Sequence, residues 1–469
     1  MTLPIRKVAI VAVSDGRERV HQGLLPVIAG HAERLERFLV DSGEAQVLRT
    51  QPIHHPEEAR AVAARIRAEG VQAVIFCQPV FGFPHNAVSL IRDLGLPTLL
   101  YAPWEPNYPA LVGVLVIGGG LSQMGLAHKR VWGDLADAET QRQLLAFVRG
   151  GAGATALRGR VVGQLGGRSM GLYTTAADGA LWQSAFGVDL DHADQSEIVR
   201  RANGIDQERV WVGVRWLLQN AEVQLDEQQL TEAKLLAQVK AYLATKDIVR
   251  DLGWDALALK CHYEMSEFYV AQCLTASLMN DAQDWEGDKP IVPTSCEADA
   301  DGALTMLAMH AICGQPTALL DVRFYDRAKA LYVLSNCGAA PTSFAGPAGV
   351  PWQEALKRVA FCPCTPKYLG GGAQVRMVFA PGEVTLARLT RDPEGYRMLI
   401  AHGETVDLPL SEVEGAAPIW PHAFVRLGIG PQELVETLEA NHLHLVRGDL
   451  RQELIEFCRF TGTRAVVVE

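Results

Sequence analysis

The sequence predicts an α/β protein with two Rossmann-like parallel-sheet domains, followed by a C-terminal mixed domain rich in antiparallel β-structure. In the first two-thirds of the chain, strand-like apolar runs alternate with amphipathic helical segments, which is typical of parallel βαβ units. In the last third, short strand-like runs follow one another and are joined by Pro-Gly and Asp-Pro-Glu-Gly turns, which indicates antiparallel pairing. The length of 469 residues suits about three domains at roughly 150 residues each.

The first block, residues 1–152, begins with the strand-like run KVAIVAV and an amphipathic helical segment. Two helix–strand pairs follow, EEARAVAARIRAEG with VQAVIFC and HNAVSLIRDLG with LPTLLYAP. Both helices end in a glycine, Gly70 and Gly95, which is a typical helix stop signal. We therefore expect an N-terminal α/β domain, separated from the next domain by the Gly/Ala-rich stretch RGGAGATALRG at 149–159.

The second block, residues 153–324, restarts the alternation with RVVGQLG and ends with the buried-type strand TALLDVR. The third block, residues 325–469, contains the short strands QVRMVFA, EVTLARLTR and YRMLIAHGETVDL. A helix–strand–helix–strand tail, from PQELVETLEA to RAVVV, closes the chain. The prediction is a central α/β domain that carries acidic site residues and a C-terminal β-rich domain that carries a site histidine.

Charge and cysteine content narrow the function classes. The net charge of −11 argues against nucleic acid or an anionic membrane as the main partner. No apolar run reaches about 18 residues, and the apolar run at 8–13 is too short for an export signal, so neither a membrane span nor secretion is expected. Nine scattered cysteines, an odd number, indicate reduced thiols and a cytoplasmic protein.

Two acids lie close to the ends of predicted strands. Glu297 precedes a helix in the segment VPTSCEADADGALTM, and Asp321 ends the apolar run ALLD. A carboxylate beside such apolar runs is costly unless it is paired or binds a cation, and open α/β sheets place ligands at the carboxyl ends of strands. The structural alternative is that Glu297 borders the helix and Asp321 pairs with Arg323; Asp299 is an equally good helix cap.

Four histidines are candidates for the same site. His442 and His444 share one face of a predicted strand, while His262 and His422 lie in the segments KCHYEM and IWPHAF. A lone histidine is more often structural than a ligand. Two carboxylates with one imidazole suit Mn²⁺ or a similar divalent ion, with water completing the coordination.

Two further motifs point to no specific chemistry. The Cys-Pro-Cys of residues 362–364 has one residue between its thiols and no second cysteine pair, a poor zinc pattern. The run GQLGGRSMG at 163–171 lacks both the dinucleotide and the phosphate-loop order. A tight strand–helix turn is the simpler interpretation; the alternative is a loop that brings Met170 or Arg168 to a ligand.

Several segments, taken in order, resemble the L-fucose isomerase family. They are DGRER, GGGLSQMGLAHKRVWGD, LRGRVVGQLGGRSMGL, VPTSCEADADGALTMLAMHAICGQPTALLDVRFYD and ANHLHLVRGDLRQEL. The resemblance spans nearly the whole chain, and it is carried by the order and spacing of these segments rather than by any one motif.

The resemblance implies a three-domain, Mn²⁺-dependent aldose–ketose isomerase, with Co²⁺ or Mg²⁺ as alternative metals. It also implies a homo-oligomer, often a hexamer, with sites at subunit interfaces and a small-molecule sugar as the ligand. By position, Glu297, Asp321 and His442 match the family's metal ligands. The metal would hold sugar oxygens O1 and O2, and the two acids would move a proton between C1 and C2 through a cis-enediolate.

The resemblance also implies six residues of the substrate site. Asn441 and Trp420 match substrate-contacting positions, and Met170 matches a position that lines the pocket. Arg17 and Arg19 fall in the N-terminal segment that reaches a neighbouring subunit's site. Lys260 stands where the family has a Gln that touches the substrate.

The residues expected to contact the substrate differ from the family pattern more than the expected metal ligands do. Lys260, Arg17, Arg19 and also Arg168 could together favour an anionic sugar such as sulfoquinovose over a neutral aldose. Two other functions stay open: a metal-dependent sugar aldolase or epimerase, and a non-catalytic sugar-binding protein on the same fold. This sequence retains Glu297, Asp321 and the pair Asn441-His442. Their retention argues against a non-catalytic protein, because sugar binding alone does not need two acids on a metal.

Overall fold

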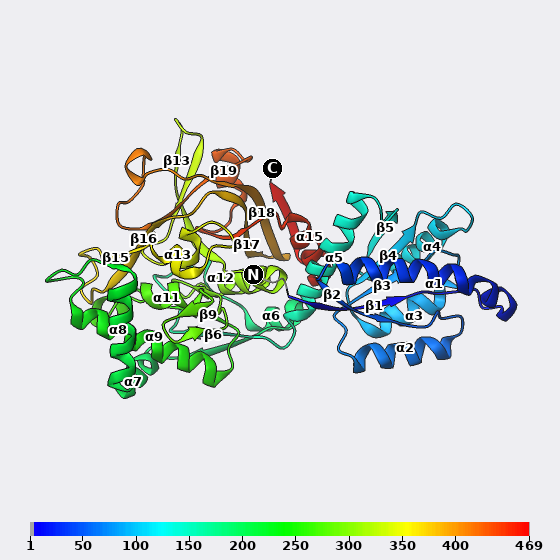
Figure 1. The fold of residues 1–469 in the computed structure, drawn as a ribbon, viewed down its shortest axis with the longest axis horizontal. Coiled ribbons are helices and arrows are strands. Elements are labelled where there is room, and N and C mark those ends of the chain that lie inside the picture. Colours follow the sequence, from blue (N-terminus) through cyan, green and yellow to red (C-terminus); the bar gives the residue numbers. More distant parts are fainter. Residues whose placement is uncertain (1–3, 469) are drawn as a thin grey trace.

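The computed structural model describes residues 4–468 and confirms the predicted α/β class. Figure 1 shows an N-terminal unit, coloured blue to cyan, on one side of the molecule. The central and C-terminal units, coloured green to red, lie together on the other side. Within the described residues, no helix combines the length and apolar character that a membrane span requires.

The N-terminal unit is a five-stranded parallel sheet in the order β2-β1-β3-β4-β5. Helices α2, α3 and α4 cover one face and α1 and α5 cover the other, because their apolar stripes pack on opposite faces of the sheet. The strands are β1 (Arg6–Val11), β2 (Ala45–Arg49), β3 (Ala73–Cys77), β4 (Thr98–Pro103) and β5 (Lys129–Gly133). The helices are α1 (Glu18–Asp41), α2 (Pro56–Ala68), α3 (Pro84–Leu94), α4 (Ala110–Gln123) and α5 (Ala138–Ala156).

The Gly/Ala-rich stretch expected to separate the first two blocks is instead mostly the last part of helix α5. Its small residues let other elements approach closely. A Cβ on Gly150 would lie 2.1 Å from the carbonyl oxygen of Glu453, and one on Gly153 would lie 2.8 Å from Ile312. The sequence reads as a linker because glycine usually breaks a helix, but here tight packing against α15 (Arg451–Thr461) and α12 (Ala300–Cys313) outweighs that propensity.

The central unit is a four-stranded parallel sheet in the order β12-β9-β6-β7. Its strands are β6 (Val161–Leu165), β7 (Asp189–Ala193), β9 (Ala256–Leu259) and β12 (Thr294–Ser295). The remaining helices of this part of the chain are α6 (Gly179–Phe186), α7 (Ser196–Gly204), α8 (Gln207–Asn220), α9 (Glu232–Leu252), α10 (Glu264–Phe268) and α11 (Cys273–Met279). A small antiparallel pair, β10 (Gln283–Asp284) and β11 (Gly287–Asp288), precedes β12.

The largest sheet has ten strands in the order β21-β18-β17-β20-β13-β14-β19-β16-β15-β8, and most of its pairs are antiparallel. The strands are β8 (Glu222–Val223), β13 (Ala318–Asp326), β14 (Leu331–Ser335), β15 (Ala360–Pro363), β16 (Ala373–Val378), β17 (Gly382–Asp392), β18 (Gly395–Thr405), β19 (Pro421–Leu427), β20 (His442–Arg447) and β21 (Arg464–Val468). Short helices α13 (Trp352–Leu356) and α14 (Pro431–Thr437) lie between them in the chain.

The strand that carries Asp321 belongs to this large sheet. β13 pairs antiparallel with both β14 and β20, and the expected boundary at residue 324 falls inside it. The central parallel sheet and the large sheet share one hydrophobic core, to which β9, α9 and α11 contribute from one side and β13, β14 and β19 from the other. The site residues that the sequence assigns to two separate domains therefore stand on two packed sheets.

Candidate active site

The candidate site lies where the central parallel sheet meets the large sheet. Glu297 comes two residues after β12, at the carboxyl end of a parallel strand, where open α/β sheets place their ligands. Asp321 on β13 pairs directly with His442 on β20. Strand pairing between segments far apart in the sequence thus brings the imidazole and this carboxylate together, and the turn after β12 adds the second carboxylate.

The three groups converge on a small volume. Nε2 of His442 lies 3.4 Å from Oε2 of Glu297 and 3.6 Å from Oδ1 of Asp321. One ligand atom from each residue lies within 4.8 Å of the others. His442 and Glu297 are buried, whereas Asp321 keeps 34% of its side chain exposed. The cluster therefore opens to solvent on the side of Asp321.

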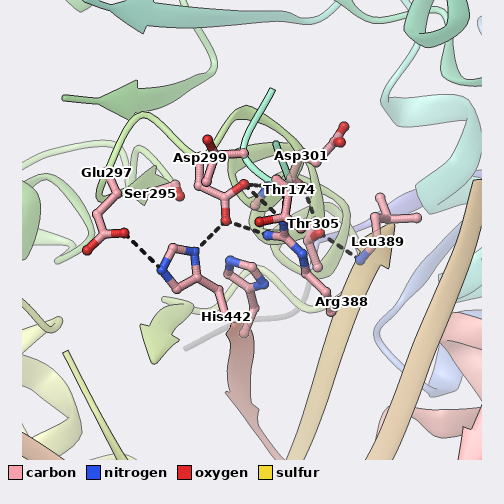
Figure 2. A network of polar contacts seen from close by, with 12 residues as sticks. Thr174, Ser295, Glu297, Asp299, Asp301, Thr305, Arg388, Leu389 and His442 are labelled. Carbon is pink, nitrogen blue, oxygen red and sulfur yellow. Dashed lines mark hydrogen bonds and ion pairs between the residues drawn. The ribbon is translucent and has the colours of Figure 1, made fainter. Parts of the chain in front are cut away.

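A buried carboxylate behind His442 determines the orientation of its ring. Nδ1 of His442 donates a hydrogen bond to Oδ2 of Asp299 at 2.7 Å (Figure 2). Asp299 also accepts the backbone N–H of Gly302 at 2.8 Å as the N-cap of α12, and it is ion-paired with Arg388, which is completely buried. Arg388 in turn donates to the carbonyl oxygen of Thr174 at 2.6 Å. This network leaves Nε2 of His442 directed at the other two carboxylates.

The pKa values in the cluster are coupled. Burial by itself would lower the pKa of His442, but the hydrogen bond to Asp299, the close contact with Glu297 and the negative charges of Asp299 and Asp321 raise it to about 10. Burial raises the pKa of Asp321 to about 6, against the opposing effect of the charged imidazole. For Asp299 the cost of burial is outweighed by Arg388 and His442, which hold its pKa well below its usual range. Protons in this cluster are therefore shared among several groups.

The backbone that presents Glu297 is strained. Glu297 and Ala298 have φ values of 60° and 52°, in the left-handed region that residues other than glycine rarely adopt. The N–H of Ala298 donates to the carbonyl oxygen of Leu259 at 3.1 Å, which ties this turn to the end of β9. Such conformations cost about 1–3 kcal/mol each and are concentrated at functional sites.

The donor set fits a divalent cation. Among the described residues, Nε2 of His442 has no hydrogen-bond partner although it is buried, an unusual state for an imidazole nitrogen. It faces two carboxylates whose mutual repulsion a cation would relieve. Two carboxylate oxygens and one imidazole nitrogen are ligands suited to Mn²⁺ and similar ions.

Asn441 and Trp420 lie on the side of the large sheet. Nδ2 of Asn441 donates to Oδ1 of Asp321 at 3.2 Å, so the residue before the histidine steadies the carboxylate opposite it. The guanidinium of Arg323 lies 4.6 Å above the ring of Trp420 and donates to the carbonyl oxygen of Gly415. Arg323 therefore does not pair with Asp321, which was the structural alternative for that carboxylate.

Lys260 and Met170 follow neighbouring strands of the central sheet. Nζ of Lys260 lies 2.7 Å from Oε1 of Glu264. Met170 is exposed and has a φ of 48°, in the loop after β6. Ser169 donates its hydroxyl to the carbonyl oxygen of His262 at 3.2 Å, so this loop is attached to the segment that carries Lys260.

Arg17 and Arg19 do not join this cluster within one chain. The start of α1 lies at the far end of the N-terminal unit in Figure 1, away from the central sheet. Arg17 pairs with Asp15 at 2.7 Å, and both arginines are exposed to solvent.

The two other candidate histidines on the large sheet, His422 and His444, do not belong to the cluster. His422 donates from Nδ1 to the carbonyl oxygen of Trp420 at 2.9 Å and accepts the N–H of Ala417 at Nε2, so neither nitrogen is free for a ligand. His444 is completely buried, and burial lowers its pKa to about 3. It is therefore a neutral core residue beside the cluster.

Sequence reasoning missed the contributions of Asp299 and Arg388 to this arrangement. Asp299 looks like an ordinary helix cap, and it does cap α12, but the same carboxylate also holds His442. Arg388 stands among apolar residues in the strand EVTLARLTR. Its side chain lies on the same face of the strand as those of Val384 and Leu386. A charge at a core-facing strand position signals a buried partner, which could have led to Asp299.

Two family models and several curated proteins match this chain. The family model for the first N-terminal domain of L-fucose isomerase matches residues 5–159, and the model for its C-terminal domain matches residues 334–468, which include His442. A sulfoquinovose isomerase from Priestia aryabhattai is 24% identical over 426 residues, covering 88% of this chain and 89% of that protein.

Two other relatives are similar to a comparable extent. A sulfoquinovose isomerase from Alkalicoccus urumqiensis is 23% identical over 415 residues, covering 85% of this chain and 86% of its own. An L-fucose isomerase from Haemophilus influenzae is 23% identical over 486 residues, covering 85% of this chain and 82% of its own. The chain therefore belongs to the L-fucose isomerase family and is an enzyme of the aldose–ketose isomerase type.

Proposed function

We propose that this protein is a Mn²⁺-dependent aldose–ketose isomerase that acts through a cis-enediolate and uses Glu297, Asp321 and His442 to hold the metal. The observation that carries the proposal is the unpartnered Nε2 of His442, which faces both carboxylates at 3.4 and 3.6 Å. Co²⁺ and Mg²⁺ are the alternative ions for the same donor set.

The two carboxylates suit the proton transfer of this reaction. A divalent cation bound here would polarise the sugar carbonyl and stabilise negative charge on the neighbouring oxygen. Glu297 approaches from the turn after β12 and Asp321 from β13, so in the proposed complex they would flank the reacting carbons. Glu297 and Asp321 would move the proton between the two carbons as general base and acid. The burial of Glu297 limits the loss of that proton to water.

We further propose that the substrate is an anionic sugar of the sulfoquinovose type. Arg168 and Lys260 follow neighbouring parallel strands, and a Cβ on Gly166 would lie 2.9 Å from Cβ of Lys260. Arg168 is exposed, and among the described residues its contact is the ring of Tyr173, 4.8 Å from its guanidinium carbon. The charge of Arg168 is thus available for a sulfonate. Lys260 would have to give up its ion pair with Glu264 before it could bind the sulfonate.

The assembly and location are part of the same proposal. We propose a homo-oligomer, a hexamer by family resemblance, in which Arg17 and Arg19 reach the site of a neighbouring subunit. Their position at the exposed far end of the N-terminal unit supports this arrangement. A cytoplasmic location accords with nine free cysteines.

Product analysis tests the proposed reaction. The metal-stripped protein would be supplied with Mn²⁺ in D₂O and incubated with sulfoquinovose, its neutral 6-deoxy counterpart quinovose, and L-fucose. The proposal predicts the corresponding ketose with deuterium at the carbon that receives the proton, and the highest kcat/KM for sulfoquinovose. A cleaved product would establish an aldolase, a C2-inverted aldose an epimerase, and binding without turnover a sugar-binding protein.

A further inference from the structure

Glu297 faces a second set of potential ligands on its other side. His262 follows β9 and Cys337 follows β14, and one ligand atom from each lies within 4.8 Å of a carboxylate oxygen of Glu297. Nε2 of His262 is 3.9 Å from Sγ of Cys337. His262 and Glu297 are buried, whereas Cys337 is partly exposed.

Hydrogen bonding fixes His262 in the tautomer that a metal requires. The hydroxyl of Ser266 donates to the carbonyl oxygen of Tyr263 at 3.1 Å. It therefore accepts at its lone pair from Nδ1 of His262, 3.2 Å away. This leaves the Nε2 lone pair directed at Cys337 and at the hydroxyl of Tyr368, 3.3 Å distant. Ligating histidines are commonly oriented in this way by a partner on their other nitrogen.

The spacing of nitrogen and sulfur matches a tetrahedral ion. Zinc bonds of about 2.3 Å to sulfur and about 2.0–2.1 Å to nitrogen, at the tetrahedral angle, put the two ligand atoms about 3.6 Å apart. The observed 3.9 Å requires a shift of only a few tenths of an ångström.

We propose that His262, Cys337 and Glu297 form a separate binding site for a thiophilic divalent cation, of which Zn²⁺ is the natural example. Soft thiolate ligands select zinc, whereas the oxygen-rich set of Asp321 and His442 suits manganese. Because both sets share Glu297, zinc in this site withdraws that carboxylate from the isomerisation site and inhibits turnover. The inhibition rests on the proposed function; the binding of zinc itself does not.

Optical titration with Co²⁺ tests the site independently of catalysis. A thiolate bound to Co²⁺ gives a charge-transfer absorption that carboxylate and imidazole ligands do not give. The titration would use metal-stripped, reduced full-length protein, with Cys337→Ala and His262→Gln as site variants. Cys77→Ala is the matched control, because Cys77 is a buried cysteine on β3 of the N-terminal sheet. Asp321→Asn disables the other metal set without touching this one.

We expect the thiolate band in the wild type, Cys77→Ala and Asp321→Asn, and its loss in Cys337→Ala and His262→Gln. Zn²⁺ should displace Co²⁺ and abolish the band. No band in the wild type, or a band that survives Cys337→Ala, overturns the proposed site. Persistence in Asp321→Asn supports the site even if no isomerase activity is found.

The inhibitory role has its own readout. In the Mn²⁺-loaded enzyme, Zn²⁺ inhibition should weaken by more than about tenfold in Cys337→Ala, since losing even an outer-shell partner costs a metal site about that much. Equal Zn²⁺ inhibition of Cys337→Ala and Cys77→Ala would show that zinc acts elsewhere, and would overturn the inhibitory part of the proposal.

Discussion

Asp299 accepts a hydrogen bond from Nδ1 of His442 at 2.7 Å, and this contact determines which imidazole nitrogen faces the two other carboxylates. Without it the ring could turn or carry its proton on Nε2, where a cation must bind. The carboxylate is itself held by Arg388 and by the first turn of α12, so the orientation of one ligand depends on three elements of the fold.

Asp299→Asn should therefore weaken metal binding and the fold together. Mn²⁺ affinity is expected to fall about 10–100-fold, the usual effect of removing the partner of a ligating histidine. The free energy of unfolding should fall by about 3–5 kcal/mol, because Arg388 is left charged and buried without its carboxylate. Calorimetric metal titration and urea unfolding measure the two effects. The partly exposed control Asp392→Asn should cost less than about 1 kcal/mol; equal behaviour of the two variants would contradict the expected role of Asp299.

Metal affinity should rise with pH. Cation binding requires Asp321 and His442 without their protons, and their pKa values are about 6 and about 10. Below about pH 6 both protons are displaced, so affinity should rise about 100-fold per pH unit; between about 6 and 10 only one is displaced, and the rise should be about tenfold per unit. Equilibrium dialysis with Mn²⁺ across a pH series measures these slopes. Asp321→Asn should lose the steeper limb, and an affinity independent of pH would argue against the cluster as the metal site.

Local patterns predict most of this fold because the alternating apolar runs form parallel strands with helical crossovers. The stretch at 149–159 reads as a linker because its glycine content is visible in the sequence, whereas the packing that makes most of it helical is visible only in the folded chain. The pairing of Asp321 with His442 is not visible locally, because the two strands are separated by more than a hundred residues. The resemblance to the family predicts that Glu297, Asp321 and His442 act together. The role of Arg388 becomes visible only when the positions of the side chains are known.

The packing of α5 predicts a contrast between two glycines. Gly150→Ala would place a methyl group 2.1 Å from the carbonyl oxygen of Glu453, so we expect a loss of about 1–3 kcal/mol in the free energy of unfolding. Gly119→Ala in helix α4 meets nothing within 4 Å and should stabilise by about 0.5–1 kcal/mol. Urea unfolding compares them. A harmless Gly150→Ala would mean that α5 and α15 are not packed this closely.

Arg168→Gln should separate the anionic sugar from its neutral counterpart. Loss of one charge-assisted hydrogen bond of about 1.5–3 kcal/mol should lower kcat/KM for sulfoquinovose by about 10–150-fold and leave quinovose unchanged. Steady-state kinetics on both sugars give the ratio, with Arg158→Gln, just after α5, as the control. An equal fall for both sugars would remove Arg168 from substrate recognition.

The central claim is that Glu297, Asp321 and His442 hold the metal on which turnover depends. The most direct measurement is a parallel titration of metal-stripped wild type and Glu297→Gln with Mn²⁺, following bound metal and isomerase turnover, with the exposed Glu383→Gln as control. The account predicts that turnover rises with occupied sites in the wild type and the control. It also predicts a kcat at least about 100-fold lower in Glu297→Gln at saturating metal. Full turnover in the stripped wild type, or wild-type turnover in Glu297→Gln, would contradict it.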